Sequence, residues 1–292
     1  MDKLELKALA KINLGLDVLG RRDNGYHDVK MVMQTIYLYD DVILKKTKES
    51  GIQLATNLSY LPVDENNIAY KAAKLLREEF ELQEGISIYL KKRIPVSAGM
   101  AGGSTNAAAV LFGMNRMFDL GLSMQELMER GVKLGADVPY CVMRGTVLAE
   151  GIGEILTPLS PMPKCTILIA KPGISVSTKT VYEKFDALSR IEHPDIDGLV
   201  RGLEEGDLQK ISSCMGNVLE MVTIEDYPII EQIKNIMKRE GALHAIMSGS
   251  GPTVFGIFED RKSAKRAYRA LREKNMAKQI YLTGVHNTGR RA

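Results

Sequence analysis

The sequence has no tryptophan, only three cysteines and four histidines, and no long apolar run. A membrane-spanning helix needs about 18 consecutive apolar residues, and no stretch of this chain approaches that length. The opening segment MDKLELKALA alternates charged and apolar side chains, so it is not expected to act as a signal peptide. These absences predict a protein that is neither exported nor held in a membrane.

The cysteines and histidines are too scattered to suggest a disulfide framework or a zinc site. Cys141, Cys165 and Cys214 form no CxxC pair, and no histidine stands near them at metal-ligand spacing. We expect three reduced thiols, which indicates a cytoplasmic location. We expect no metal site built from protein ligands alone.

The charges are nearly balanced. Lys plus Arg number 39 against 36 for Asp plus Glu, and a net charge of +3 is too small to indicate a nucleic-acid partner. The basic stretch 91–93 and the terminal Arg290 and Arg291 are expected to be solvated. The sequence leaves the oligomeric state open.

A length of 292 residues suggests two domains, since domains typically contain about 100–200 residues. Apolar residues on alternate positions predict strands over 2–19 and 29–46, and the spacing predicts a helix over 65–80. A strand over 86–90 and an alanine-rich helix over 104–118 follow. Ser123 and Glu126 form a capping-box pattern that predicts another helix, ended by Gly135.

Three prolines crowd residues 157–163, which predicts a domain boundary between 158 and 159. The expected domains are therefore 1–158 and 159–292. Strands and helices are mixed in both, which predicts an α+β fold of two sandwiches with helices on one face of each sheet. In the second domain we expect strands over 165–170, 242–247, 253–258 and 279–285, and helices over 228–240 and 262–274.

The segment 94–108, IPVSAGMAGGSTNAA, carries the strongest chemical signal. A backbone with few large side chains can wrap around a phosphate, and the free N–H groups at the start of the following helix add donors. The segment lacks both the lysine of the Walker A motif and the GxGxxG spacing of dinucleotide folds. The alternative reading is a tight loop between a strand and a packed helix.

The ordered motifs of the chain resemble those of the GHMP kinase superfamily. Residues 95–106 match its ATP loop, and Lys11–Leu14 and Ser248–Thr253 match its other two blocks. The Gly25–His27 and Gly135–Pro139 blocks are similar to the branch that phosphorylates 4-diphosphocytidyl-2-C-methyl-D-erythritol. The resemblance implies a two-domain GHMP kinase fold, with an N-terminal ribosomal-protein-S5-domain-2-like ATP domain and a C-terminal ferredoxin-like α/β sandwich.

The resemblance also implies roles for individual residues. Asp137 would accept the proton of the substrate hydroxyl, and Lys11 would hold that hydroxyl and stabilise charge on the γ-phosphoryl oxygens. From spacing alone, a turn-forming residue is the preferred interpretation of Asp137, and a solvated edge-strand lysine that of Lys11. The implied ATP-binding residues are Pro95, Ser97, Ala98, Gly99, Met100, Ala101, Gly102, Gly103, Ser104, Thr105 and Asn106. The implied substrate-binding residues are Asn13, Tyr26, His27, Thr178, Tyr182, Gly249 and Ser250.

Four residues of the ATP loop depart from the usual family pattern. Met100, Ala101 and Thr105 replace Leu, Gly and Ser, and Ser97 replaces a common Gly at a place where a side chain is expected to fit. At positive φ, Ala101 would cost about 1 kcal/mol relative to glycine. Mg²⁺ is expected with ATP. Because segment 104–118 contains no glutamate, phosphates, water and Ser104 are its expected ligands.

The expected function is ATP-dependent phosphorylation of the 2-hydroxyl of this cytidine-diphosphate substrate in the non-mevalonate isoprenoid pathway, giving the 2-phosphate and ADP. Tyr26 and Tyr182 would stack on the cytosine, and His27 would bind its edge. Two alternatives stay open: another small-alcohol kinase of the superfamily, acting on homoserine, mevalonate or a sugar, and a non-catalytic nucleotide-binding regulator on the same fold.

Overall fold

The computed structural model describes residues 1–288, so Arg290 and Arg291 lie outside the described part. Within it the chain forms eleven strands and ten helices, which group into two compact units. The first unit contains Met1–Ala10, Leu38–Val96 and Ala101–Met143. The second contains Lys11–Tyr37, Ser97–Met100 and the chain from Arg144 onward.

Neither unit is one continuous segment of the chain. Strands β1 (Lys3–Arg21) and β2 (His27–Thr47) each contribute residues to both units, so each unit is assembled from several chain segments. Units of this kind do not define one boundary along the chain, so the domain boundary predicted between 158 and 159 stays a prediction. At that place β6 (Ile155–Pro158) ends and a connection of seven residues leads to β7 (Thr166–Lys171).

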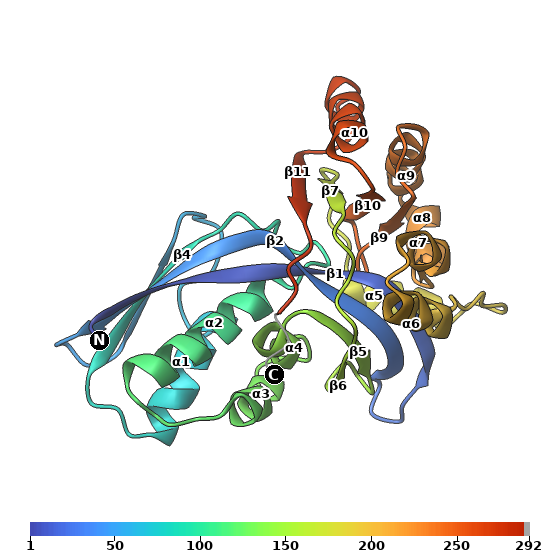
Figure 1. Cartoon of the computed structure of the whole chain (residues 1–292). Helices are drawn as coiled ribbons and strands as arrows, with labels where there is room; N and C mark the ends of the chain where they lie inside the picture. The colour runs from blue at the N-terminus through green and yellow to red at the C-terminus, as the bar shows by residue number, and fades with distance from the viewer. Residues whose placement is uncertain (289–292) are drawn as a thin grey trace. The chain divides into compact units, whose positions relative to one another are not determined.

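The first unit is a sheet with helices along one face. Strand β2 pairs antiparallel with β4 (Gly85–Lys91), and β3 (Ile52–Thr56) pairs parallel with β4. Helices α1 (Ile68–Glu79) and α2 (Gly102–Met117) lie side by side next to these strands (Figure 1). Val42 and Leu44 are fully buried, as alternate positions of a strand with one covered face should be. The predicted strands over 2–19, 29–46 and 86–90 are confirmed.

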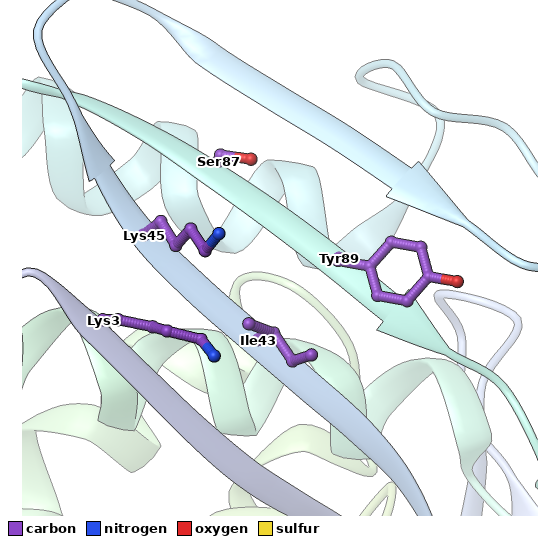
Figure 2. Close-up of a pocket in the computed structure, with 5 residues that line it drawn as sticks. All are labelled: Lys3, Ile43, Lys45, Ser87 and Tyr89. Atoms are coloured by element: carbon purple, nitrogen blue, oxygen red, sulfur yellow. The ribbon is translucent and has the colours of Figure 1, made fainter.

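The other face of these strands carries polar and exposed side chains. Figure 2 shows Ile43 and Lys45 of β2 beside Ser87 and Tyr89 of β4, around a shallow hollow that Lys3 also lines. In the register of the two strands Ile43 stands opposite Tyr89, and Lys45 opposite Ser87. The alternation of Leu44 inward and Lys45 outward is the sequence pattern that predicted this sheet.

Helix α3 (Met124–Val132) has the predicted capping box. The Ser123 hydroxyl accepts from the Glu126 N–H, while the Glu126 carboxylate accepts from the Ser123 N–H. The helix ends at Val132, before Gly135. Helix α4 (Val138–Met143) follows and was not predicted, because six residues are too few to show a helical period. Pro139 is tolerated there because the first turn of a helix needs no N–H donor.

The second unit contains a four-stranded antiparallel sheet in the order β11-β7-β10-β9. Its other strands are β9 (His244–Met247), β10 (Val254–Phe258) and β11 (Gln279–Gly284), with helices α9 (Ile229–Arg239) and α10 (Arg261–Glu273) packed beside them (Figure 1). β7, the first of these strands along the chain, therefore lies between β10, the third, and β11, the last. The ferredoxin-like sandwich expected for this part of the chain, with its helices over 228–240 and 262–274, is confirmed.

Apart from its segments of β1 and β2, the rest of the second unit is made of short elements that the sequence patterns missed. Strands β5 (Thr146–Glu150) and β6 form a hairpin, and β5 pairs with β2 at Met31–Gln34. Strand β8 (Gly216–Asn217) pairs parallel with β1 at Gly15 and Leu16. The remaining helices are α5 (Thr178–Phe185), α6 (Ile196–Glu205), α7 (Leu208–Cys214) and α8 (Glu220–Asp226).

Of the helices within residues 1–288, none combines the length and the apolar character needed to cross a membrane. The three cysteines are free thiols. Cys165 is buried, and burial raises the pKa of its thiol to about 12, so this thiol stays protonated and unreactive at neutral pH.

Candidate active site

Three sequence blocks that stand far apart in the chain meet in the second unit. The backbone N–H of Lys11 in β1 donates to the carbonyl oxygen of Met100 over 3.3 Å. The hydroxyl of Ser248 donates to the carbonyl oxygen of Gly99 over 2.9 Å, and accepts from the N–H of Asn13 over 3.4 Å. The strand block, the first glycine loop and the second glycine turn thus form one hydrogen-bonded cluster.

Two glycines allow this close approach. Gly99 has φ +69°, and a Cβ placed on it would stand 2.0 Å from the carbonyl oxygen of Ser248. Gly249 has φ +59°, and a Cβ on it would lie 3.3 Å from the Cα of Gly99. Both backbone conformations favour glycine, and at Gly99 the lack of space requires it.

Lys11 and Asn13 lie on the same face of β1, two residues apart. Lys11 is 5% exposed, and its Nζ donates to Oδ1 of Asn13 over 2.6 Å; Asn13 is fully buried. The prediction of a solvated strand lysine is wrong for this side chain. A buried ammonium fixed by a neighbouring amide is suited to stabilise negative charge on a bound ligand.

The first glycine loop leads into α2, which begins at Gly102 and not at the predicted Ser104. Its N-cap, Ala101, has φ 54° and no side-chain acceptor, so the first N–H groups of the helix are left for another partner. Ser97 also lies at positive φ, at 49°. Each residue costs about 1 kcal/mol relative to glycine, which had been expected only at Ala101.

The predicted ATP-binding residues divide by exposure. Ser97 and Gly103 are exposed, and Gly99, Ala101, Gly102 and Ser104 are half-buried. These six can contact a ligand. The others are buried and form the base of the loop: Pro95, Ala98, Met100, Thr105 and Asn106.

A buried cluster in the first unit, which we call the first anchor, consists of Asp40, Lys92 and Asn106. The ammonium of Lys92 donates to the carboxylate of Asp40, and the amide of Asn106 donates to the same carboxylate over 2.9 Å. Lys92 also donates to Oδ1 of Asn106 over 2.7 Å. The prediction that Lys92 is solvated is wrong, since the side chain is buried against its counter-ion. Burial lowers the pKa of Lys92 although Asp40 acts in the opposite direction.

Asp137 stands at the start of α4 in the first unit. Its carbonyl oxygen accepts from the N–H of Cys141 over 3.1 Å, and the N–H of Val138 donates to Gly135 over 3.0 Å. These bonds fix the backbone on both sides of a half-buried carboxylate. A carboxylate held in this way can accept a proton at a defined position.

Two of the predicted base-binding residues, His27 and Tyr182, lie together in the second unit. The rings of His27 and Tyr182 lie 4.6 Å apart at an interplanar angle of 34°. Nε2 of His27 lies 2.7 Å from Oδ1 of Asp186, which also pairs with Arg21 at 3.3 Å. Tyr26 is 59% exposed, so its ring is not packed under a loop.

The predicted polar substrate residues Thr178 and Ser250 are paired, with their hydroxyls 2.7 Å apart. A second buried cluster, the second anchor, holds the turn that contains Ser250. It consists of Asn217, Glu220 and Lys234. The amide of Asn217 donates to the carbonyl oxygens of Met247 and Gly249, each over 2.8 Å. Glu220 accepts from the N–H of Met247 over 2.6 Å and from Lys234 over 2.8 Å.

Sequence reasoning named Asn106 as an ATP-binding residue, but it missed the other members of both anchors and Asp186. One signal was present for Asp40, since an acidic residue interrupts the apolar alternation of β2. The partners of Asp186 and Glu220 stand far away in the sequence, and no local pattern marks either residue.

Within residues 1–288, no three His, Cys, Asp or Glu side chains gather as a metal site. Ser104, in the first turn of α2, offers a hydroxyl oxygen as a candidate Mg²⁺ ligand. This donor set fits a Mg²⁺ ion that arrives with the phosphates and keeps several waters.

The chain matches known families over most of its length. Residues 67–145 match the GHMP kinases N terminal domain, and residues 199–277 match the GHMP kinases C terminal domain. A relative from Lachnospira eligens, named 4-diphosphocytidyl-2-C-methyl-D-erythritol kinase, is 57% identical over 97% of this chain and 98% of its own. A relative of the same name from Lachnoclostridium phytofermentans is 55% identical over 97% of both chains.

Solved structures show the same fold. A crystal structure of 4-(cytidine 5'-diphospho)-2C-methyl-D-erythritol kinase matches with a TM-score of 0.83 at 30% identity, over 98% of this chain and 100% of its own. A homoserine kinase from Cytophaga hutchinsonii matches with a TM-score of 0.80 at 20% identity, over 99% and 96% of the two chains, which supports the fold alone. The chain therefore belongs to the GHMP kinases and is an ATP-dependent small-molecule kinase.

Proposed function

We propose that the chain transfers the γ-phosphoryl group of ATP to the 2-hydroxyl of 4-diphosphocytidyl-2-C-methyl-D-erythritol, giving the 2-phosphate and ADP. Relatives that share 55–57% of its residues bear the name of this kinase. Within the chain, the observation that carries the choice of substrate is the contact between the rings of His27 and Tyr182. An aromatic pair beside an exposed Tyr26 fits a flat base.

Each part of the substrate has a candidate partner. Tyr26 and Tyr182 would cover the faces of the cytosine, and His27 would bind its edge. Thr178 and the turn at Gly249 and Ser250 offer hydroxyl and N–H donors to the diphosphate, and Asn13 offers an amide to the polyol. Thr178 and Ser250 are already hydrogen-bonded to each other, so they would present a shaped polar surface.

The glycine loop and the N-terminus of α2 would bind the phosphates of ATP, with Mg²⁺ offsetting charge on the β- and γ-phosphates. The substrate oxygen would attack the γ-phosphorus while the bond to ADP breaks, and the hydroxyl proton would pass to Asp137. Lys11 would stabilise the charge that develops on the phosphoryl oxygens. Carbon 2 also bears the methyl branch, so the hydroxyl is tertiary and crowded, and catalysis depends on alignment.

The reaction is tested by measuring ADP release from ATP and Mg²⁺ with a panel of alcohols. We expect release with the cytidine substrate and none with homoserine, mevalonate or galactose. Asp137→Ala should lower kcat by about a thousandfold, in the range of a lost general base plus misalignment. Glu129→Gln, an exposed change on α3, serves as the control.

Competition by cytidine monophosphate tests the base-binding residues separately. We expect it to inhibit the wild type and to lose potency in Tyr182→Ala. Turnover of the cytidine substrate with no competition would contradict the roles of His27 and Tyr182. Unchanged turnover in Asp137→Ala would contradict the role of the carboxylate.

We also propose that the protein acts in the cytoplasm. All three cysteines are free thiols, and Cys141 and Cys165 are buried in the folded chain. Thiols of this kind suit a reducing compartment.

A further inference from the structure

One carboxylate fixes both ends of the first glycine loop within the first unit. On the side before the loop, Oδ1 of Asp40 accepts from the backbone N–H groups of Arg93 and Ile94, over 2.6 and 2.8 Å. On the side after it, Oδ2 accepts from the amide of Asn106 over 2.9 Å. Asp40 is fully buried, so its carboxylate has no competing water.

Lys92 connects this carboxylate to the first turn of α2. Its Nζ donates to Asp40, to Oδ1 of Asn106 over 2.7 Å and to the carbonyl oxygen of Gly102 over 3.2 Å. A Cβ on Gly102 would lie 3.4 Å from that Nζ and 3.1 Å from Cγ2 of Ile94. The absence of a side chain at Gly102 leaves room for the ammonium.

Gly102 directly follows Ala101, the residue in the left-handed conformation. Strained conformations of this kind persist only when the surrounding structure fixes them. The hydrogen bond from Lys92 to the Gly102 carbonyl fixes the peptide that joins Gly102 to Gly103, one peptide beyond Ala101, and the contacts of Asn106 fix the turn that follows. The residue with the strained backbone is thus next in the chain to a residue that the buried ion pair contacts.

We propose that the first anchor is a positioning device for ATP, in which Asp40 and Lys92 hold Ala101 in its left-handed conformation and thereby aim the N–H groups of α2 at the phosphates. The inference rests on the proposed function of the glycine loop in binding ATP. We infer that the three buried anchor residues act on the nucleotide through the loop and not by direct contact, so they are positioning residues. The effect should appear in nucleotide binding before it appears in the chemical step.

The test measures the dissociation constant of ADP with Mg²⁺, together with KM for ATP and kcat. A single change at Asp40 would leave Lys92 buried without a counter-ion, so the main variant is the neutral pair Asp40→Asn with Lys92→Met. We expect the dissociation constant and KM to rise about tenfold, the scale of one strained residue released, and kcat at saturating ATP to fall less than about threefold.

A second change separates positioning from a general loss of structure. Ala101→Gly removes the penalty for positive φ, so in the neutral-pair variant it should restore most of the lost affinity. In the wild type it should change affinity less than about twofold, since the loop is already held. A merely structural role of the anchor predicts no such rescue.

Two further variants keep the inference open to refutation if the neutral pair folds poorly. Asn106→Ala leaves the ion pair in place and should weaken ADP binding by about threefold, the scale of one buried hydrogen bond. Glu79→Gln with Arg130→Met removes a partly exposed ion pair between α1 and α3, and should leave ADP binding unchanged.

Equal affinity in the wild type and the neutral-pair variant, or lost affinity that Ala101→Gly does not restore, would overturn the inference while the proposed function stands. A wild type that binds no ADP would overturn both.

Discussion

The two anchors use the same residue types in different arrangements. In the first anchor Asp40 is the one carboxylate that the described structure pairs with Lys92. In the second, Lys234 pairs with Glu220 at 2.8 Å and with Glu231 at 3.0 Å. Burial works against the charge of both lysines, yet it lowers the pKa of Lys92, whereas two carboxylates outweigh it and raise the pKa of Lys234. The second carboxylate beside Lys234 stabilises the charged form of this buried ammonium more than Asp40 alone stabilises that of Lys92.

The anchors also differ in the groups with which they form hydrogen bonds. The first receives donors from backbone and side chains on both sides of the ATP loop. In the second, Asn217 and Glu220 bind the backbone of Met247 and Gly249, and Asn217 also accepts from the N–H of Leu219 over 3.0 Å. The first should therefore be the more sensitive of the two to loss of its carboxylate.

The substitution Asp40→Ala should have the largest effect on the free energy of unfolding. The change removes the counter-ion of Lys92 and the acceptor of two backbone N–H groups, so the free energy of unfolding should fall by about 4 kcal/mol. Urea denaturation followed by circular dichroism measures it. Asp41→Ala, the neighbouring residue that pairs with Arg93 near the surface, is the control and should cost less than about 1 kcal/mol.

Glu220→Ala should cost about 2 kcal/mol, less than Asp40→Ala because Lys234 keeps Glu231 as a partner. The same denaturation experiment gives the value. A loss as large as that of Asp40→Ala would show that the second carboxylate does not relieve the lysine, and would break the comparison between the anchors.

His244 of β9 extends the comparison to pH, because Lys234 of the second anchor is one of the charges that act on its ring. Burial, with help from Lys238 and Lys234, lowers the pKa of His244 to about 4. Because the folded pKa lies below the unfolded value of about 6.5, the neutral ring stabilises the fold fully above pH 6.5, and this contribution is lost as pH falls towards 4. We expect a loss of about 2 kcal/mol for this partly accessible ring. His244→Gln should remove that part of the acid dependence in thermal denaturation, and an unchanged acid limb would contradict it.

The smallest expected effect is a gain of stability at Ala101→Gly. Relief of positive φ exceeds the extra entropy of glycine in the unfolded chain, so unfolding should cost about 0.5 kcal/mol more. Ala270→Gly within α10 is the matched control, and should lower stability by about 1 kcal/mol because it lies inside a helix. The same sign for both changes would contradict the left-handed conformation of Ala101.

The sequence was sufficient for the elements with long, regular patterns. Alternation identified β1 and β2, and the strands and helices of the four-stranded sheet followed from their apolar periods. The three family blocks were found from their motifs, and hydrogen bonds of Lys11, Gly99 and Ser248 join these blocks in the structure.

Other features depend on contacts between distant residues and could not be predicted from a local pattern. Lys92 belongs to a basic stretch that is typical of a solvated surface, and only its pairing with Asp40 on a neighbouring strand makes it a core residue. Helices α4 and α7 contain six and seven residues, too few for a period. The positive φ of Ser97 follows from the path of the loop and not from its residue type.

The near contact between Gly99 and Gly249 also has a consequence for engineering. If the first loop is randomised, the backbone carbonyl of Ser248 leaves no room for a side chain at Gly99, whatever residue stands at 248. Productive libraries should therefore keep Gly99 fixed, whereas Ser97 and Ala101 already show that the rest of the loop accepts residues with side chains.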